Sequence, residues 1–159
     1  MADLTDLLAR LSREKVEYVI VGGFAAVLHG SSVVTEDVDI CCRFTATNLL
    51  RLQKAVADLH PVHRLTPKRL PLKLTAANCR GLKNLYLETD WGVVDCLGEV
   101  LGLGSYANVR KQSILVALPF GRCRAVSLAA LIKAKEAMGR PHDLKSVEQL
   151  KAIQARRRR

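Results

Sequence analysis

Apolar residues follow two different spacings along the chain, and the change from one spacing to the other predicts the elements. Apolar positions three and four residues apart indicate helices at 3–14, 24–28, 48–59, 128–138 and from 141 to about 155. Short β-rich apolar runs bounded by turn residues indicate strands at 18–21, 38–42, 82–88, 92–97, 114–118 and 123–126. No long repeat interrupts this order.

Polar residues at the ends of these runs predict where helices begin and stop. Thr45 or Thr47 is placed to cap the helix over 48–59, and Ser127 is placed to cap the helix that ends at Gly139. Pro141 suits the first turn of the last helix. Along that helix a row of apolar residues is expected to face the core: Leu144, Val147, Leu150 and Ile153.

Three segments are expected to lack long regular elements. The basic stretch 60–73 predicts a weak strand and a loop, either solvated or in contact with substrate phosphates. Residues 89–92 predict a hairpin turn containing Asp90. The glycine-rich stretch 98–108 predicts a loop or a short turn.

Residues 18 to 40 carry the most informative pattern. A buried strand, Tyr18–Val21, ends at Gly22 and Gly23, and a short helix follows. The next strand opens with Asp37 and Asp39, two residues apart. Because side chains alternate along a strand, both carboxylates point to one face, while Val38 and its neighbours point to the core.

Two like charges on one strand face repel each other unless a cation lies between them. Carboxylate oxygens suit Mg²⁺ or Mn²⁺. Glycines without side chains let backbone N–H groups approach phosphate closely. Together these features indicate a site for a metal-bound nucleoside triphosphate. A calcium loop is excluded, because Ile40, Cys41 and Cys42 supply no side-chain oxygen ligands.

The combined motif resembles that of the polymerase-beta-like nucleotidyltransferase superfamily. It consists of Gly22-Gly23, thirteen further residues and Asp37-Val38-Asp39-Ile40. His29-Gly30 and Thr35 are similar to the minimal bacterial branch, which includes toxins of abortive-infection toxin–antitoxin systems. The resemblance implies an α/β (or α+β) fold: a small mixed β-sheet flanked by helices, with C-terminal helices and the carboxylates at one end.

Asp95 lies in the middle of an otherwise apolar strand, Val-Val-Asp-Cys-Leu. A lone carboxylate is costly to bury there unless it is paired or binds a metal. The resemblance implies a third carboxylate on such a strand, which makes Asp37, Asp39 and Asp95 the catalytic and metal-binding set. Glu99 is a weaker candidate for the third acid. The alternative for Asp95 is a structural ion pair with a buried arginine or lysine.

The resemblance also implies nucleotide-binding residues: Gly22, Gly23, Ser31, Thr35 and Lys135. Lys135 occupies a matching position in Leu131-Ile132-Lys133-Ala134-Lys135, before Arg140-Pro141-His142-Asp143. Arg140 and Asp143 form either a structural ion pair or part of the pocket, and His29 either packs or lines the pocket. Many relatives have an arginine where this chain has Val33-Val34, which puts one contact to the nucleotide in doubt.

Length and composition place these features in one domain over 1–159, with a core at about 15–126, helices at 127–155 and a basic tail at 156–159. The formal charge of +10 is partly due to the tail Arg156–Arg159, which is either solvated or attracts phosphates. Five scattered cysteines predict buried free thiols and a cytoplasmic location. Neither a signal peptide nor a membrane span is predicted.

The resulting hypothesis is a Mg²⁺- or Mn²⁺-dependent enzyme that moves a nucleoside monophosphate from a nucleoside triphosphate to an acceptor hydroxyl. The acceptor is RNA (including tRNA), a protein or a small molecule, and the base preference stays open. Two alternatives stay open as well: a non-catalytic nucleotide- or RNA-binding module of the same fold, and the toxin half of a toxin–antitoxin pair. The expected protein partners are a second copy or a cognate antitoxin.

Overall fold

The computed structural model describes residues 4–32 and 34–158. The helices, in chain order, are α1 (Leu4–Arg13), α2 (Gly22–Leu28), α3 (Ala46–Val56), a 3-10 turn (Ala57–Leu59), α4 (Tyr106–Lys111), α5 (Leu128–Met138) and α6 (Pro141–Arg157). The strands are β1 (Tyr18–Val21), β2 (Asp37–Cys42), β3 (Val62–His63), β4 (Asn84–Thr89), β5 (Gly92–Leu97), β6 (Glu99–Val100), β7 (Gly104–Ser105), β8 (Ser113–Leu118) and β9 (Gly121–Val126).

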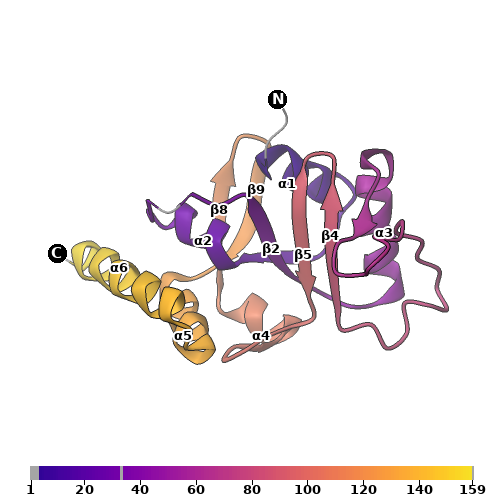
Figure 1. Cartoon of the computed structure of the whole chain (residues 1–159). Helices are drawn as coiled ribbons and strands as arrows, with labels where there is room; N and C mark the ends of the chain where they lie inside the picture. The colour runs from indigo at the N-terminus through magenta and orange to yellow at the C-terminus, as the bar shows by residue number, and fades with distance from the viewer. Residues whose placement is uncertain (1–3, 33, 159) are drawn as a thin grey trace.

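Seven of these strands form one mixed sheet, in the order β3-β4-β5-β2-β1-β9-β8. Strand β2 runs parallel to β5, β1 runs parallel to β9, and the other neighbours are antiparallel. In Figure 1, α1 passes behind β5, whereas α2 lies in front of the sheet. The expected mixed sheet flanked by helices, with helices at the C-terminus, is confirmed.

The core is built from the predicted apolar faces. Val38 and Ile40 on β2 are fully buried, as the alternation along that strand requires. Helix α1 buries one side through Leu7, Leu8 and Leu11, as its helical spacing predicts. All five cysteines are free and buried, as expected for small apolar side chains in strands. No helix in the described ranges is long and apolar enough to cross a membrane.

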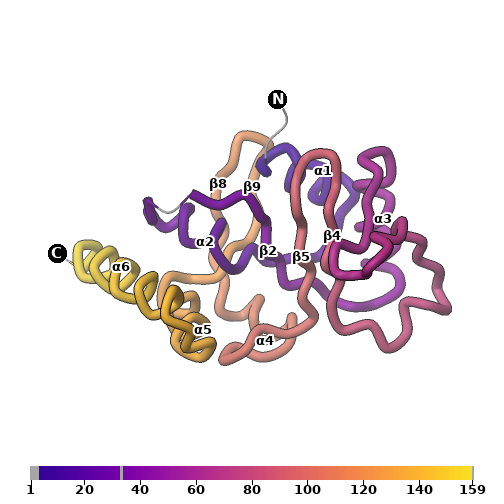
Figure 2. The backbone as a smooth tube through the Cα atoms, viewed as in Figure 1, coloured from indigo at the N-terminus to yellow at the C-terminus, as the bar shows by residue number. Residues whose placement is uncertain are grey.

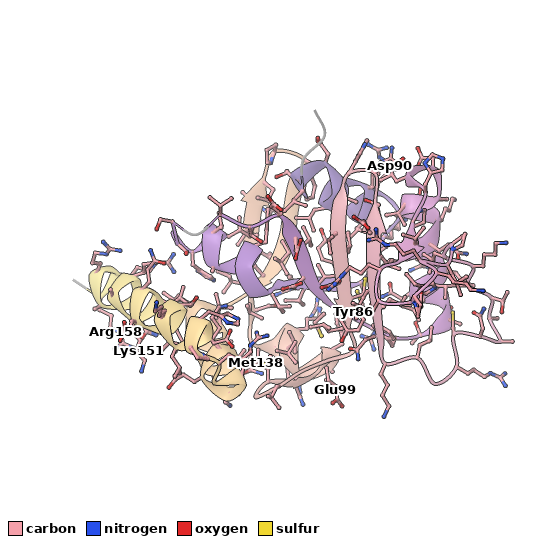
Figure 3. All side chains as sticks on the ribbon, viewed as in Figure 1. Tyr86, Asp90, Glu99, Met138, Lys151 and Arg158 are labelled. Atoms are coloured by element: carbon pink, nitrogen blue, oxygen red, sulfur yellow. The ribbon has the colours of Figure 1, made fainter. Side chains whose placement is uncertain are left out.

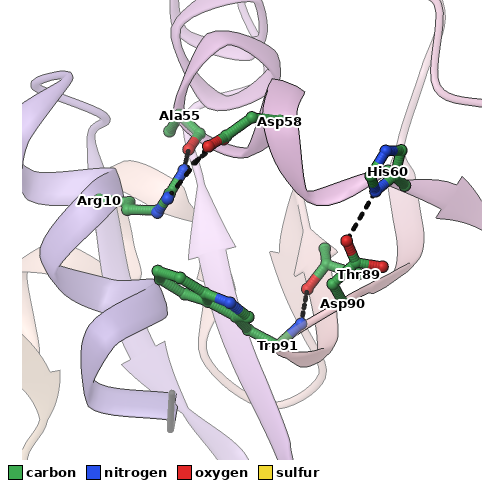
Figure 4. A network of polar contacts seen from close by, with 7 residues as sticks. All are labelled: Arg10, Ala55, Asp58, His60, Thr89, Asp90 and Trp91. Atoms are coloured by element: carbon green, nitrogen blue, oxygen red, sulfur yellow. Dashed lines mark hydrogen bonds and ion pairs between the residues drawn. The ribbon is translucent and has the colours of Figure 1, made fainter. Parts of the chain in front are cut away.

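A polar cluster holds α1 against the β4–β5 turn and the segment after α3 (Figure 4). Arg10 pairs with Asp58 after α3, and its guanidinium lies 4.3 Å from the centroid of the Trp91 ring. Asp90 occupies the hairpin turn between β4 and β5, as expected, and its Oδ2 lies 2.6 Å from Nδ1 of His60. This cluster lies beside the N-terminal ends of β2 and β5. It joins α1, the turn after α3 and the β4–β5 hairpin turn.

Helices α5 and α6 form a hairpin that lies to one side of the sheet (Figure 2). Ser127 accepts a hydrogen bond from the Ala130 N–H, and Gly139 ends α5 in the left-handed conformation, both as predicted. The expectation for Leu144 is wrong, because that side chain is half exposed while Val147, Leu150 and Ile153 are buried. The buried position in the first turn is taken by Asp143 instead.

The C-terminal arginines differ from the predicted tail. Helix α6 continues through Arg157, so Arg156 and Arg157 are helical, and Arg159 lies outside the described residues. The Arg157 guanidinium donates to the backbone oxygen of His29 at 3.0 Å. His29 itself is buried and its Nε2 lies 2.7 Å from the Val126 oxygen. His29 therefore packs between elements, and Arg157 anchors the end of α6.

Three boundaries also differ from expectation. Helix α2 begins at Gly22, so the glycine pair is its first turn and does not precede it. Thr45 caps α3 by accepting from the Asn48 N–H, so the helix starts at Ala46 and includes Thr47. The stretch 98–108 is not a plain loop: it forms the β6–β7 hairpin and the start of α4, an element that the sequence patterns did not predict.

Candidate functional site

The glycine pair lies directly against the strand that carries the aspartates. Gly22 has a φ of +64°, and a Cβ atom there would lie 2.3 Å from Oδ2 of Asp39. A Cβ atom on Gly23 would lie 3.2 Å from Oγ1 of Thr35. Only glycine satisfies both the backbone conformation and the close approach at position 22. The turn therefore leaves its backbone open beside a carboxylate.

Strand pairing brings the three aspartates to one place in the sheet. Asp39 pairs in register with Val21 of β1 on one side and with Asp95 of β5 on the other. Asp37 is two residues away on the same face of β2 and is exposed. Thr35 fixes the start of β2, since its hydroxyl donates to the backbone oxygen of Asp37 at 3.0 Å. The predicted grouping of Asp37, Asp39 and Asp95 thus follows from the β2–β5 register.

The surroundings of Asp39 disfavour the ionised form of its carboxyl group. The pKa of Asp39 is raised from 3.8 to about 6, chiefly by burial and in part by the neighbouring charges of Asp95 and Asp37. Lys135 and Arg64 act in the opposite direction without cancelling the effect. A carboxylate held in this way gains from a cation placed beside it.

Asp95 is held differently. Nε of Arg64 donates to Oδ1 of Asp95 at 2.9 Å, and Nη2 of Arg64 donates to Oδ2 at 2.5 Å. The Arg64 guanidinium also lies 5.5 Å from the centroid of the Tyr86 ring, in the strand position that pairs with Asp95. This fork uses both carboxylate oxygens, and it raises the pKa of Arg64. The structural ion pair weighed for Asp95 is therefore present.

These contacts test how well the residues suit Mg²⁺ or Mn²⁺. Asp37 and Asp39 fit, because they supply hard oxygen ligands on one face of β2 and form no ion pair with any described residue. Asp95 does not fit in the arrangement seen, because Arg64 occupies it. Within residues 4–32 and 34–158, no group of three histidine, cysteine or acidic side chains is arranged to hold a metal. The pair on β2, without Asp95, is the metal-competent part of the site.

The junction of α5 and α6 contributes charge from the other side. Asp143 is 2% exposed and accepts from Nε of Arg140 at 2.6 Å, which lowers its pKa. Nζ of Lys135 lies 3.9 Å from Oδ1 of the same carboxylate. Arg140 and Asp143 were expected either to form an ion pair or to belong to the pocket. They form an ion pair and also line the cavity described next.

A cavity of about 660 Å³ opens between β2, the β6–β7 hairpin and α5, a volume in the range of small-ligand sites. Figure 3 labels three of its lining residues, Tyr86, Glu99 and Met138, which come from the sheet, the small hairpin and α5. Most of the predicted site residues line this cavity: Gly22, Gly23, Thr35, Asp37, Asp39 and Lys135.

Two of the predicted site residues, Ser31 and Asp95, do not line the cavity. Asp95 lies beneath Arg64, and the Ser31 hydroxyl donates to Oε1 of Gln149 on α6 at 3.1 Å. Ser32 accepts from the same Gln149 side chain. These serines join the loop after α2 to α6, away from the glycine pair. Val33 of the Val33-Val34 departure lies outside the described residues.

Sequence reasoning missed several contributors to the site. Arg64 was expected on a solvated or phosphate-contacting flank, yet it pairs with Asp95 across β4. Val100, Leu101 and Leu103 line the cavity from a stretch expected to be a loop. The unpaired acid in a buried strand was the one available signal that a cation should lie nearby. Nothing in the local pattern singled out Arg64 from the other basic residues of 60–73.

Comparisons with solved structures agree with the fold described above. The chain is similar to TM1012 of Thermotoga maritima, proposed to be a nucleotidyltransferase, with a TM-score of 0.58 and 18% identity over 92% of this chain and 88% of that one. It is also similar to ANT(2")-Ia, solved with adenylyl-2"-tobramycin, with a TM-score of 0.54 and 17% identity over 96% and 92% of the two chains.

No protein-family model matches the chain, and no curated protein matches it in sequence. At such low identity the two solved structures establish the fold and not the activity. The chain has a nucleotidyltransferase-like fold.

Proposed function

We propose that this protein is a metal-dependent nucleotidyltransferase that moves a nucleoside monophosphate from a nucleoside triphosphate to an acceptor hydroxyl and releases pyrophosphate. One observation carries the proposal. Asp39, whose pKa is raised to about 6, lies between the glycine turn and Asp95 and lines a cavity of small-ligand size. The shared fold of two nucleotidyltransferase-related structures supports it.

Each residue has a role in this proposal. Asp37 and Asp39 would hold Mg²⁺ or Mn²⁺, which supplies charge neutralisation and Lewis acidity at the phosphates when bound. Gly22 and Gly23 let the backbone approach the phosphates, and Thr35 keeps the strand entry in place. The Lys135 ammonium, largely buried beside the cavity, attracts the negative charge of the phosphates.

The proposed transfer is an in-line displacement. The acceptor oxygen forms a bond to the α-phosphorus, and the bond to the bridging oxygen of the β-phosphate breaks. Pyrophosphate leaves with that electron pair. The proton of the acceptor hydroxyl goes to the Asp95 carboxylate, which requires Arg64 to release at least one of its two oxygens. Freeing Asp95 from Arg64 is thus part of the proposed reaction.

A second hollow of about 580 Å³ adjoins the first one and shares Asn84, Glu99, Val100 and Leu101 with it. We assign the acceptor to this side, because both hollows meet at the C-terminal end of β5. The acceptor stays open between RNA, including tRNA, a protein and a small molecule. The net charge of +10 favours an anionic acceptor.

The test is to incubate the protein with each α-labelled nucleoside triphosphate, Mg²⁺ or Mn²⁺, and total RNA and protein extracts. Label should enter an acceptor from the α-labelled nucleotide and not from the γ-labelled one, because the pyrophosphate leaves. A double Asp37→Asn, Asp39→Asn variant serves as the matched control. Transfer of γ-label, or equal labelling by the double variant, would contradict the proposal.

The Arg64–Asp95 pair favours one alternative, a non-catalytic module that binds nucleotide or RNA on the same fold. Such a module would bind a Mg²⁺–nucleotide complex with no turnover in any extract. Either function would suit a cytoplasmic protein that acts as a homodimer or as the toxin half of a toxin–antitoxin pair. The neighbouring gene and the mass of the purified protein distinguish these settings.

A further inference from the structure

One edge of the seven-stranded sheet is long, apolar and uncovered. Strand β8 (Ser113–Leu118), called the β8 edge below, is the last strand on its side, and no described residue pairs with its outer side. Its sequence, Ser-Ile-Leu-Val-Ala-Leu, has no charged residue and no proline. Ile114 is 43% exposed and Leu115 is 54% exposed. An edge of this kind pairs readily with another strand.

The opposite edge of the same sheet is protected. Strand β3 has only two residues, follows Pro61 and makes an isolated bridge to Pro71. Arg69 and Glu88 form an ion pair beside it. Short length, prolines and charges are the usual means by which proteins blunt an edge strand. Since the chain blunts one edge and leaves the β8 edge open, the β8 edge is the one available for pairing with another strand.

The two faces of the β8 edge differ in chemistry. Leu115 pairs with Arg124 of β9, and Ala117 pairs with Arg122, so this face carries two guanidinium groups. Arg124 already reaches across to the edge, since its NH1 donates to the Ser113 hydroxyl at 3.2 Å. On the other face, Ile114 and Val116 lie next to Ala125 and Cys123, which are buried. One face is basic and the other continues the core.

Charge around the β8 edge is of one sign. The chain has no aspartate or glutamate between Glu99 and Glu136, a segment that includes α4, β8 and β9. Arg110 and Lys111 lie three and two residues before the first residue of β8. Arg122 is exposed and forms no ion pair with any residue of the described ranges. The segment that forms the basic face therefore supplies no negative charge of its own to balance it.

These charges decide between two occupants of the edge. If two copies paired through β8, both would bring the same basic residues to the interface, and the segment between Glu99 and Glu136 would bring no acidic residue to meet them. Like charges would then be brought together in the new interface. An extended segment with negative charge meets the same edge with attraction at every basic position. The second copy is thus the disfavoured occupant.

We propose that the β8 edge binds an extended segment of a partner protein in which acidic and apolar residues alternate. The segment adds as a further strand of the sheet, through backbone hydrogen bonds to β8. Its acidic side chains share the face of Arg122 and Arg124, and its apolar side chains extend the face of Ile114 and Val116. This surface is independent of the nucleotide site.

The test uses a fluorescent nonapeptide of alternating glutamate and valine, with fluorescence polarisation as the readout. It should bind, and binding should weaken as salt is raised. A peptide of the same composition with its glutamates and valines in separate blocks, and one with lysine in place of glutamate, should bind at least about tenfold more weakly. Equal binding of the block peptide would overturn the proposal, because charge alone would then explain it.

Two further comparisons test strand addition directly. The alternating peptide is made with N-methyl groups on all valines or on all glutamates, and one of these versions should lose at least about tenfold in affinity, because strand pairing needs those donors. The double variant Arg122→Glu, Arg124→Glu should lose a similar factor. The matched control is Arg51→Glu, Arg80→Glu, two exposed arginines elsewhere, which should keep wild-type affinity.

Three results would overturn the proposal. The first is full binding by both N-methylated peptides. The second is an equal loss in the Arg51→Glu, Arg80→Glu control. The third is a dimer in sedimentation equilibrium that the alternating peptide dissociates, since a second copy would then be the occupant. Thermal melting of both double variants confirms that each one is folded before its affinity is compared.

Discussion

The β2 side and the β5 side of the site hold their carboxylates in opposite ways. Asp39 and Asp95 occupy paired positions on two parallel strands. Asp39 has neighbouring negative charges and a raised pKa of about 6, whereas Asp95 is bound through both oxygens by Arg64. The β2 side can therefore accept a metal cation, whereas Asp95 on the β5 side is already paired with the Arg64 guanidinium.

This difference teaches that register alone does not make a metal site. The strands bring three acids together, but a single side chain from a distant loop decides which of them is free. The same logic applies at Asp143, which is nearly fully buried and held by Arg140 and Lys135. A buried acid with an arginine fork serves the structure until something displaces the arginine. The following predictions test the difference, from the largest effect to the smallest.

The largest effect is expected on the β2 side. Replacing both Asp37 and Asp39 by Asn removes the metal-competent pair. Transfer should fall by roughly 10³-fold, which corresponds to several kcal/mol of lost charge stabilisation. Stabilisation by Mg²⁺ in thermal melts should disappear in the same variant. If Mg²⁺ still raises the melting temperature as much as in the wild type, the metal is held elsewhere.

On the β5 side, Asp95→Asn keeps the shape and removes the charge. Transfer should fall by roughly 10²-fold, the scale of a positioned general base, with little change in affinity for the Mg²⁺–nucleotide complex. The loss of the Arg64 pair should cost about 1–2 kcal/mol of unfolding free energy, because Arg64 is partly exposed. A folded Asp95→Asn protein with full transfer activity would remove Asp95 from the mechanism. Loss of activity only in proportion to unfolding would assign it a structural role.

A smaller effect concerns pH and Asp39. Because its folded pKa of about 6 lies above the unfolded value of 3.8, the folded state binds more protons between these values, and stability falls as pH rises through that window. Asp39→Asn should therefore be more stable than the wild type above pH 6, by roughly 2–3 kcal/mol, and no more stable near pH 4. Chemical denaturation of both proteins across pH 4 to 8, without metal, measures this. A constant difference over the whole range would contradict the raised pKa.

The smallest effect is expected at the glycine turn. Gly23→Val adds a side chain beside Oγ1 of Thr35, at the mouth of the cavity. Nucleotide affinity should fall by about tenfold, or 1.4 kcal/mol, with circular dichroism close to that of the wild type. Nucleotide titration of the folded variant is the measurement. Unchanged affinity would show that the phosphates do not approach this turn.

Much of the fold follows from local patterns. The apolar run Tyr18–Val21, the Ser127 cap and the alternation around Val38 each predict an observed element, because each depends on neighbours in sequence. The β6–β7 hairpin and α4 were missed, since glycine-rich sequence permits turns and short strands alike. Leu144 was assigned to the core by spacing, but the packing of α6 on α5 buries Asp143 instead.

The sequence by itself determined that Asp37 and Asp39 share a strand face beside a glycine turn, because alternation along a strand and the tolerance of glycine are local properties. It also indicated that Asp95 needs a cation, because burying a lone carboxylate is costly. Only the tertiary structure decided that Arg64 supplies this cation, that Ser31 binds Gln149, and that the β8 edge is open while the β3 edge is blunted. These outcomes depend on contacts between segments far apart in the chain, which no spacing of neighbouring residues encodes.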